Sequence, residues 1–165
     1  MAQQNIELGP CRVTVDGSDV GPTLGPVCVA VRTLWRDRRS DRYGATITDR
    51  VAIGAEVAAS FRVAEKTFEN MQRTLPGALA GDGTLGVGRS PGGKASASAA
   101  ALRLHPEERG EDTGRDVVLH KAVATGELSA GYGAGGARAF DVEFVALLDA
   151  AQSDGDFLAC FHQAD

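Results

Sequence analysis

The sequence lacks a long apolar segment. No run of apolar residues approaches the roughly 18 that a membrane-spanning helix needs. The first residues, Met1–Glu7, are polar where a signal peptide would be basic and then apolar. We therefore expect no membrane segment, and we expect synthesis in the cytoplasm without export by that route.

Cysteine is scarce, and basic residues are outnumbered by acidic ones. The three cysteines, Cys11, Cys28 and Cys160, form no CxxC pair. This spacing indicates neither a zinc site nor a disulfide framework, so we expect all three thiols to be buried as small apolar groups. The 22 acidic and 17 basic residues give a formal net charge of −5. Proteins that hold nucleic acid through its phosphates have the opposite sign, so the composition disfavours tight DNA binding.

The sequence does contain enough residues for one folded domain. Its 165 residues are 43% hydrophobic and 24% charged, which is typical of a single globular unit spanning 1–165. The 21 glycines concentrate in two stretches, which we interpret as loops. The segment 81–98 is rich in glycine and serine and poor in apolar side chains. We expect it to be a flexible loop within the domain.

Alternation of apolar and polar residues predicts strands along most of the chain. The spacing changes at Ala64, Phe68, Met71 and Leu75, which predicts one helix ended by Pro76. The segment 36–43 is too polar for a core and should be an exposed loop or a projecting hairpin tip. The expected strands are 11–16, 27–35, 46–53, 57–63, 99–104, 117–124, 140–147 and 156–161. Together these elements predict a mainly β (α+β) fold, an antiparallel sandwich or barrel with one flanking helix.

Two glycine-rich motifs resemble nucleotide sites only in part. The run Gly88–Lys94 matches the first seven positions of a phosphate-binding loop, but Ala95 replaces the hydroxyl that must hold magnesium. Gly131, Gly133 and Gly136 form a GxGxxG that precedes a strand, whereas a dinucleotide site needs a helix there. Both stretches are better interpreted as loops.

Catalytic and metal-binding patterns are also incomplete. His105, His120 and His162 have no HExxH spacing, and we expect each on the surface or in a strand ladder. No GxSxG surrounds a serine. We therefore expect no enzymatic activity, no metal and no cofactor. A nucleotide hydrolase that depends on Lys94 is the remaining enzymatic alternative.

The order of the segments is more informative than any single motif. The chain opens with GPCRVTVDG and VGPT, continues with DRYGATITD, a strand and AEKTF at the start of the helix, and ends with VVLHKA and RAFDVEFVALLD. In this order the segments resemble the tail tube proteins of tailed bacteriophages over most of the chain. The segment 81–98 has no counterpart in that family.

The resemblance implies a two-sheet fold flanked by a helix. It further implies six copies in a ring and rings stacked into the tube through which the genome is ejected. The implied partners are further copies, the tape measure, baseplate or tail-tip and terminator proteins, and double-stranded DNA in transit. The implied location is the virion tail, after synthesis in the bacterial cytoplasm. A single-ring adaptor or terminator, a tube subunit of a gene transfer agent or bacteriocin, and a monomeric binding module remain alternatives.

Three groups of residues become candidate sites under this resemblance. The charged segment is expected at the contact between stacked rings, through Arg36, Asp37, Arg38, Arg39, Asp41 and Arg42. One polar strand face is the candidate lining of the bore, through Glu56, Ser60 and Arg62, with a solvated outer face as the alternative. The helix stripe of Phe68, Met71 and Leu75 would cover its own sheet or a neighbouring copy. Six copies of a chain with charge −5 carry −30, which would repel phosphates from the bore.

Overall fold

The computed structural model describes residues 10–64, 67–87, 93–125, 127, 139–152 and 158–162. These residues form one α-helix, α1 (Phe68–Thr74), and three short 3-10 turns, η1 (Asp41–Tyr43), η2 (Ala95–Ser98) and η3 (Glu107–Arg109). The strands are β1 (Cys11–Val15), β2 (Ser18–Asp19), β3 (Cys28–Arg39), β4 (Ile47–Val63), β5 (Leu79–Gly81), β6 (Thr84–Gly86), β7 (Ala100–Pro106), β8 (Val117–Ala124), β9 (Phe140–Ala146) and β10 (Ala159–Phe161). The predicted mainly β fold with one helix is confirmed.

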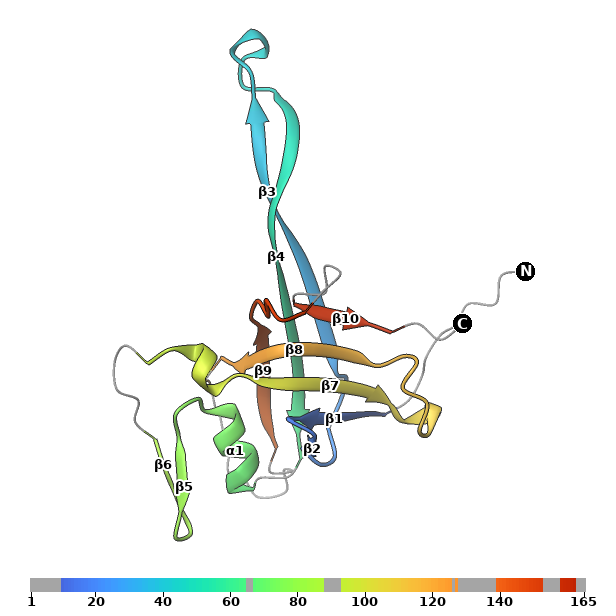
Figure 1. Cartoon of the computed structure of the whole chain (residues 1–165), viewed down its shortest axis with the longest axis vertical. Coiled ribbons are helices and arrows are strands. Elements are labelled where there is room, and N and C mark those ends of the chain that lie inside the picture. The colour runs from blue at the N-terminus through green and yellow to red at the C-terminus, as the bar shows by residue number, and fades with distance from the viewer. Residues whose placement is uncertain are drawn as a thin grey trace, which may run out of the picture.

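Eight strands belong to one antiparallel sheet with the order β2-β1-β7-β8-β9-β4-β3, and β10 pairs with β8 beside this path. One edge of β8 changes partner along its length, from β10 at Val117–Leu119 to β9 at Ala122–Ala124. Figure 1 shows β1, β7 and β8 crossing in front of β4 and β9. The sheet is not closed into a barrel. One bent sheet therefore encloses the main core, instead of the two separate sheets that the resemblance implies.

The core lies where the inward faces of these strands meet. Alternate residues of β9 are buried, as the period-2 pattern predicts. Phe61 and Phe144 stack at the centre, with ring centroids 6.0 Å apart. On β4 the buried residues are Val57, Ala59, Phe61 and Val63, and the residues between them point outward. The predicted alternation at 57–63 is thus confirmed.

A long two-stranded arm projects from this core, formed by β3 and the first part of β4 (Figure 1). The sequence predicts separate strands before and after Gly54, and this prediction is wrong. The prediction of an exposed, projecting hairpin tip at 36–43 is confirmed, although residues 36–39 belong to a strand. Strand β4 runs without a break through Gly54, which pairs with Leu34, and β3 continues to Arg39. A β-bulge next to this pair, where the register shifts between Leu34 and Trp35, lets the ladder continue. Residues 40–46 connect the two strands at the end of the arm, and Gly44 there adopts a positive φ of 61°.

Helix α1 is shorter than predicted, and the residues that it turns toward the core are not those of the predicted apolar stripe. Thr67 caps its N-terminus by accepting a hydrogen bond from the Asn70 backbone N–H. The buried residues are Asn70 and Thr74, whereas Phe68 of the predicted stripe is 48% exposed. Met71 packs against the core only partly, and Leu75 is half-buried. The polar face can be buried because Asn70 donates to the Val20 carbonyl and Thr74 donates to the Asn70 carbonyl, both at 2.8 Å.

The segment 81–98 is more regular than a loop in its described part. Strands β5 and β6 form a separate hairpin, and η2 lies just before β7. Residues 88–92, and with them most of the phosphate-loop motif, lie outside the described residues, as do Gly131, Gly133 and Gly136. The last predicted strand is observed as β10 alone, since 153–157 are not described. No described helix is long and apolar enough to cross a membrane.

Candidate functional site

The arm exposes an unusual amount of apolar surface. All residues of β4 from Ile47 to Glu56 are exposed, although a strand normally buries one face. Large apolar side chains on both strands are half or more open to solvent. They include Val31 and Trp35 at 55% and Ile53 at 62% exposure. Contiguous exposed apolar surface of this kind marks contact sites on soluble proteins.

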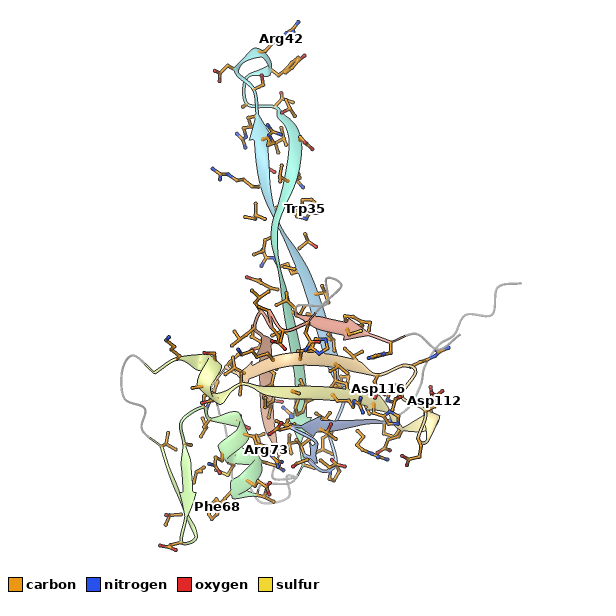
Figure 2. All side chains as sticks on the ribbon, in the orientation of Figure 1. Trp35, Arg42, Phe68, Arg73, Asp112 and Asp116 are labelled. Carbon is orange, nitrogen blue, oxygen red and sulfur yellow. The ribbon has the colours of Figure 1, made fainter. Side chains whose placement is uncertain are left out.

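One face of the arm continues the inward face of the core. Val31 pairs with the buried Val57, and two residues further along each strand Thr33 pairs with Ala55. Beyond the bulge, Trp35 pairs with Ala52 on the same side of the ladder. Figure 2 shows Trp35 standing out from the arm with no other element beside it. The apolar character of the core face thus extends along the arm without a covering layer.

Both backbone edges of the arm are also unpaired within the described residues. Strand β3 is the last strand of the sheet, so its outer edge has no neighbour. Strand β4 pairs with β9 only from Ala58 to Val63, so its outer edge is open along the arm. Open edges leave N–H and C=O groups available to a strand from another chain.

The candidate ring-contact residues lie together at the outer part of the arm. Asp37 forms an ion pair with Arg50 of β4, whose Nε lies 3.0 Å from Asp37 Oδ1. Arg42 stacks over the Tyr43 ring, 5.7 Å from its centroid, and lies at the far end of the arm in Figure 2. Within the described chain, no ion-pair partner is found for Arg36, Arg38, Arg39 and Arg42. The tip of the arm therefore carries an excess of uncompensated positive charge.

The candidate bore residues share one exposed face of β4. Glu56, Ser60 and Arg62 alternate with the buried core residues, and Glu56 pairs in register with Arg32. Arg62 is positively charged, whereas a lining that repels DNA must be negative, but Arg62 forms an ion pair with Asp141 of β9. Its Nε and Nη2 donate to the two carboxylate oxygens at 2.8 and 2.9 Å. The hydrogen bonds from Arg62 hold the pKa of the Asp141 carboxyl below its ordinary value.

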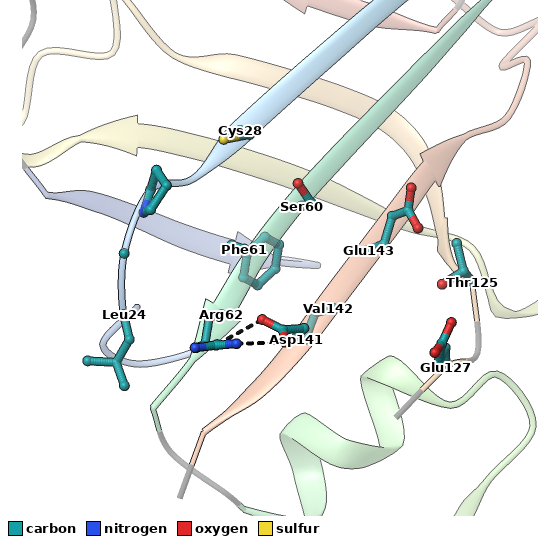
Figure 3. Close-up of a pocket in the computed structure, with 12 residues that line it drawn as sticks. Leu24, Cys28, Ser60, Phe61, Arg62, Thr125, Glu127, Asp141, Val142 and Glu143 are labelled. Atoms are coloured by element: carbon teal, nitrogen blue, oxygen red, sulfur yellow. Dashed lines mark hydrogen bonds and ion pairs between the residues drawn. The ribbon is translucent and has the colours of Figure 1, made fainter. Parts of the chain in front are cut away.

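A hollow of about 700 Å³ surrounds this ion pair at the base of the sheet (Figure 3). Ser60 and Arg62 form one wall, and Asp141 and Glu143 of β9 form the next. Thr125 and Glu127 approach from the segment after β8, and Leu24 borders the hollow on the other side (Figure 3). Since Arg62 is paired with Asp141, Glu127 and Glu143 leave the hollow negatively charged. Neither glutamate has an ion-pair partner among the described residues.

A buried polar cluster lies elsewhere, on β7. The predicted position of His105 in a strand ladder is confirmed, since His105 pairs in register with Arg12 of β1, and its side chain is buried, with 7% exposed. Its Nδ1 lies 2.6 Å from Asp116 Oδ1, and its Nε2 lies 2.7 Å from the Gly110 carbonyl oxygen. Because both neighbours are acceptors, this geometry favours the protonated imidazole, in which both ring nitrogens donate. The hydrogen bond to Asp116 raises the pKa of His105, and the bond to Gly110 adds to this.

Asp116 is fully buried and also meets Arg103, whose Nε lies 3.2 Å from Asp116 Oδ2. The hydrogen bonds and ion pairs of this cluster connect the turn after β7 to the start of β8. No motif in the sequence marks it, because the partners are 11 residues apart in a charged turn. The sequence does not indicate that His105 and Asp116 form a buried, hydrogen-bonded pair.

The cysteines differ from the prediction as well. Cys28 is exposed, and Cys11 and Cys160 are only half-buried. Burial is nonetheless sufficient to raise the pKa of the Cys11 thiol. No group of three or more potential metal ligands occurs among the residues that the structure describes.

The chain matches no protein-family model and no curated protein by sequence. Its fold is similar to that of the sheath/tube terminator of PVC, an extracellular contractile injection system, determined by cryo-EM in the extended state. The TM-score is 0.51 with 9% sequence identity, and the match covers 88% of this chain and 94% of that one. The likeness extends over nearly the whole of both chains and concerns the fold.

Proposed function

We propose that the chain is a structural subunit of a phage-tail-like tube, in which copies close into a ring and rings stack. The arm carries this proposal, because it combines two open strand edges with an uncovered apolar face. In an isolated molecule such an arm would invite uncontrolled pairing. Copies arranged around an axis would join the edge of β3 to the edge of β4 in the next copy and satisfy both.

The comparison supports a role of this class. The protein of similar fold is described as a terminator of a sheath and tube, which is a structural component of an injection particle. The resemblance of the sequence to tail tube proteins points in the same direction. We infer six copies in each ring and a location in the tail of a virion or related particle. We propose no catalytic role.

The proposed function also assigns a lining to the bore of the ring. We infer that the β4 face with Glu56 turns toward the axis, where carboxylates repel the phosphates of passing duplex DNA. Pairing of Arg62 with Asp141 supports this orientation, because it neutralises one of the cations on this face, and the other, Arg32, lies opposite Glu56 in register. A basic lining would instead bind DNA non-specifically, with dissociation constants of about 10⁻⁴ to 10⁻⁶ M.

A single-ring terminator is the second candidate. The description of the similar structure as a terminator favours it. A terminator would close into one ring and add no further rings, whereas a tube subunit would stack without limit. The two candidates share the ring contact and differ only in stacking.

Sedimentation velocity of the purified chain over a wide concentration range tests the proposal. We expect a monomer to give way to a ring-sized species and then to larger particles, with hollow tubes or rings in negative-stain images. Isolated rings at every concentration would select the terminator. A strictly monomeric chain in all buffers would exclude both candidates.

A further inference from the structure

The tip of the arm and the hollow at the base lie at opposite ends of the same strand. Strand β4 starts at the tip with Ile47 and reaches the hollow at Ser60 and Arg62. At about 3.3 Å per residue, this places the two features about 50 Å apart. Figure 1 shows the arm running along the longest axis of the molecule, away from the body.

The two ends carry opposite charge. At the tip, residues 36–50 have five arginines and three aspartates; Asp37 is bound to Arg50, and Asp49 lies opposite Arg38 in register. In the hollow, Arg62 and Asp141 cancel, which leaves Glu127 and Glu143. The excess is therefore positive at one end and negative at the other. Each end thus keeps a net charge after the ion pairs of the described residues are counted.

From this arrangement we propose that the tip of each arm docks in the acidic hollow of a second copy in the next ring. This inference rests on the proposed function and adds the stacking contact to it. A surface at one end that binds a different surface at the other end is heterologous, and repetition along the long axis produces an open filament. The occupant of the hollow is thus another copy of this chain.

The hollow is large enough to receive side chains of this occupant. Its volume of about 700 Å³ lies within the range of pockets that bury ligands, roughly 300–1,000 Å³. The tip is narrow, since only the turn η1 and its flanks connect the two strands. Arginine suits the contact because its planar guanidinium binds carboxylates through two hydrogen bonds and so fixes the register between rings.

Docking would divide the bore candidates into two groups. Ser60 and Arg62 line the hollow, so the incoming tip would cover them at the junction between rings. Glu56 lies outside the hollow and would stay open to the bore. The Arg62–Asp141 pair would form the floor of the contact.

Charge reversal tests the docking. One variant carries Arg38→Glu and Arg39→Glu, a second carries Glu127→Arg and Glu143→Arg, and a third carries all four substitutions. Lys94→Glu and Glu108→Arg, at exposed positions away from tip and hollow, are matched controls. Tube length in negative-stain images and the sedimentation profile are the readouts, at low and high salt.

We expect each double variant to form rings that no longer stack, with mean tube length reduced at least tenfold. The fourfold variant should regain long tubes, and both controls should resemble the wild type. Wild-type tube length in either double variant, or no recovery in the fourfold variant, would overturn the docking contact. Isolated wild-type rings would overturn it too, yet leave the ring-forming function intact. Solitary wild-type monomers would instead exclude the proposed function itself.

Discussion

Arg62 and Asp141 face each other across neighbouring strands of the sheet and form a two-pronged ion pair. Both side chains are more than half exposed, at 53% and 69%. The two residues are 79 positions apart in sequence, but β4 and β9 are adjacent, with Arg62 and Asp141 directly opposite in register. The pair neutralises the Arg62 cation on a face that also carries Glu56 and Glu143, as the proposed lining of a conduit for DNA requires.

Substitution of Arg62 by Gln should raise the pKa of the Asp141 carboxyl toward its ordinary value. The two hydrogen bonds from Arg62 are the main cause of the lowered pKa. Stability should change little, because water screens so exposed a pair. Titration of the carboxyl carbon by NMR measures the shift. Arg50→Gln is the control, since Arg50 binds Asp37 instead; an Asp141 midpoint equal in all three proteins would contradict the assignment.

His105 should make the folded chain more stable in mild acid than in base. Its pKa is raised on folding, so its contribution is complete below the unfolded value of about 6.5 and is lost as pH rises through the folded pKa. Asp116 and Arg103 lie against it, and Arg12 opposes its charge. We expect the difference in unfolding free energy between wild type and His105→Gln to be larger at pH 6 than at pH 9.

Urea unfolding at a series of pH values measures that difference. The exposed His162 provides the control variant His162→Gln, which should keep the pH dependence of the wild type. Identical pH profiles for wild type and His105→Gln would refute the charged, doubly bonded state of His105.

The core and the arm should respond differently to substitution. Phe140 is 1% exposed, so Phe140→Ala should cost about 3–5 kcal/mol of unfolding free energy. Ile53 on the arm is 62% exposed, so Ile53→Ser should change the stability of the dilute monomer by less than about 0.5 kcal/mol. The same Ile53→Ser should weaken assembly. Urea unfolding and sedimentation velocity separate the two effects; equal destabilisation by both substitutions would mean that the arm is packed in the monomer.

Reversal of charge at Glu56 should make the proposed bore bind duplex DNA. Glu56 is exposed on the proposed lining and pairs in register with Arg32, so Glu56→Lys leaves two adjacent cations. We expect assembled Glu56→Lys to retain duplex DNA in a pelleting assay at low salt and to release it as salt rises. Glu108→Lys, at an exposed position in η3, should behave as the wild type. Equal DNA retention by all three proteins would place Glu56 outside the bore.

The sequence predicts the buried elements better than the exposed ones. Strand β9 and the part of β4 from Val57 follow from alternation because one face of each is in the core, and β8 follows from its mostly apolar sequence. The arm cannot be predicted in this way, because neither of its faces is buried in the monomer. Gly54 is therefore interpreted as the end of a strand. A pattern that depends on burial in a partner cannot be recognised from one chain.

Polar residues account for the remaining errors in fold and site. The inward face of α1 is carried by Asn70 and Thr74, whose hydrogen bonds depend on Val20 and on the helix itself. The burial of His105 depends on Asp116 in the same way. Such partners come together only through tertiary structure, so neither hydropathy nor spacing indicates them.

The central claim is that the arm is buried between copies of the chain, and Trp35 reports on it directly. Trp35 is the single tryptophan of the sequence and is 55% exposed in the monomer. Fluorescence emission and acrylamide quenching, compared between dilute monomer and sedimented assembly, measure its environment. We predict that assembly shifts the emission to shorter wavelength and lowers the quenching constant severalfold. An assembly in which Trp35 remains as red-emitting and as readily quenched as in the monomer would contradict the account.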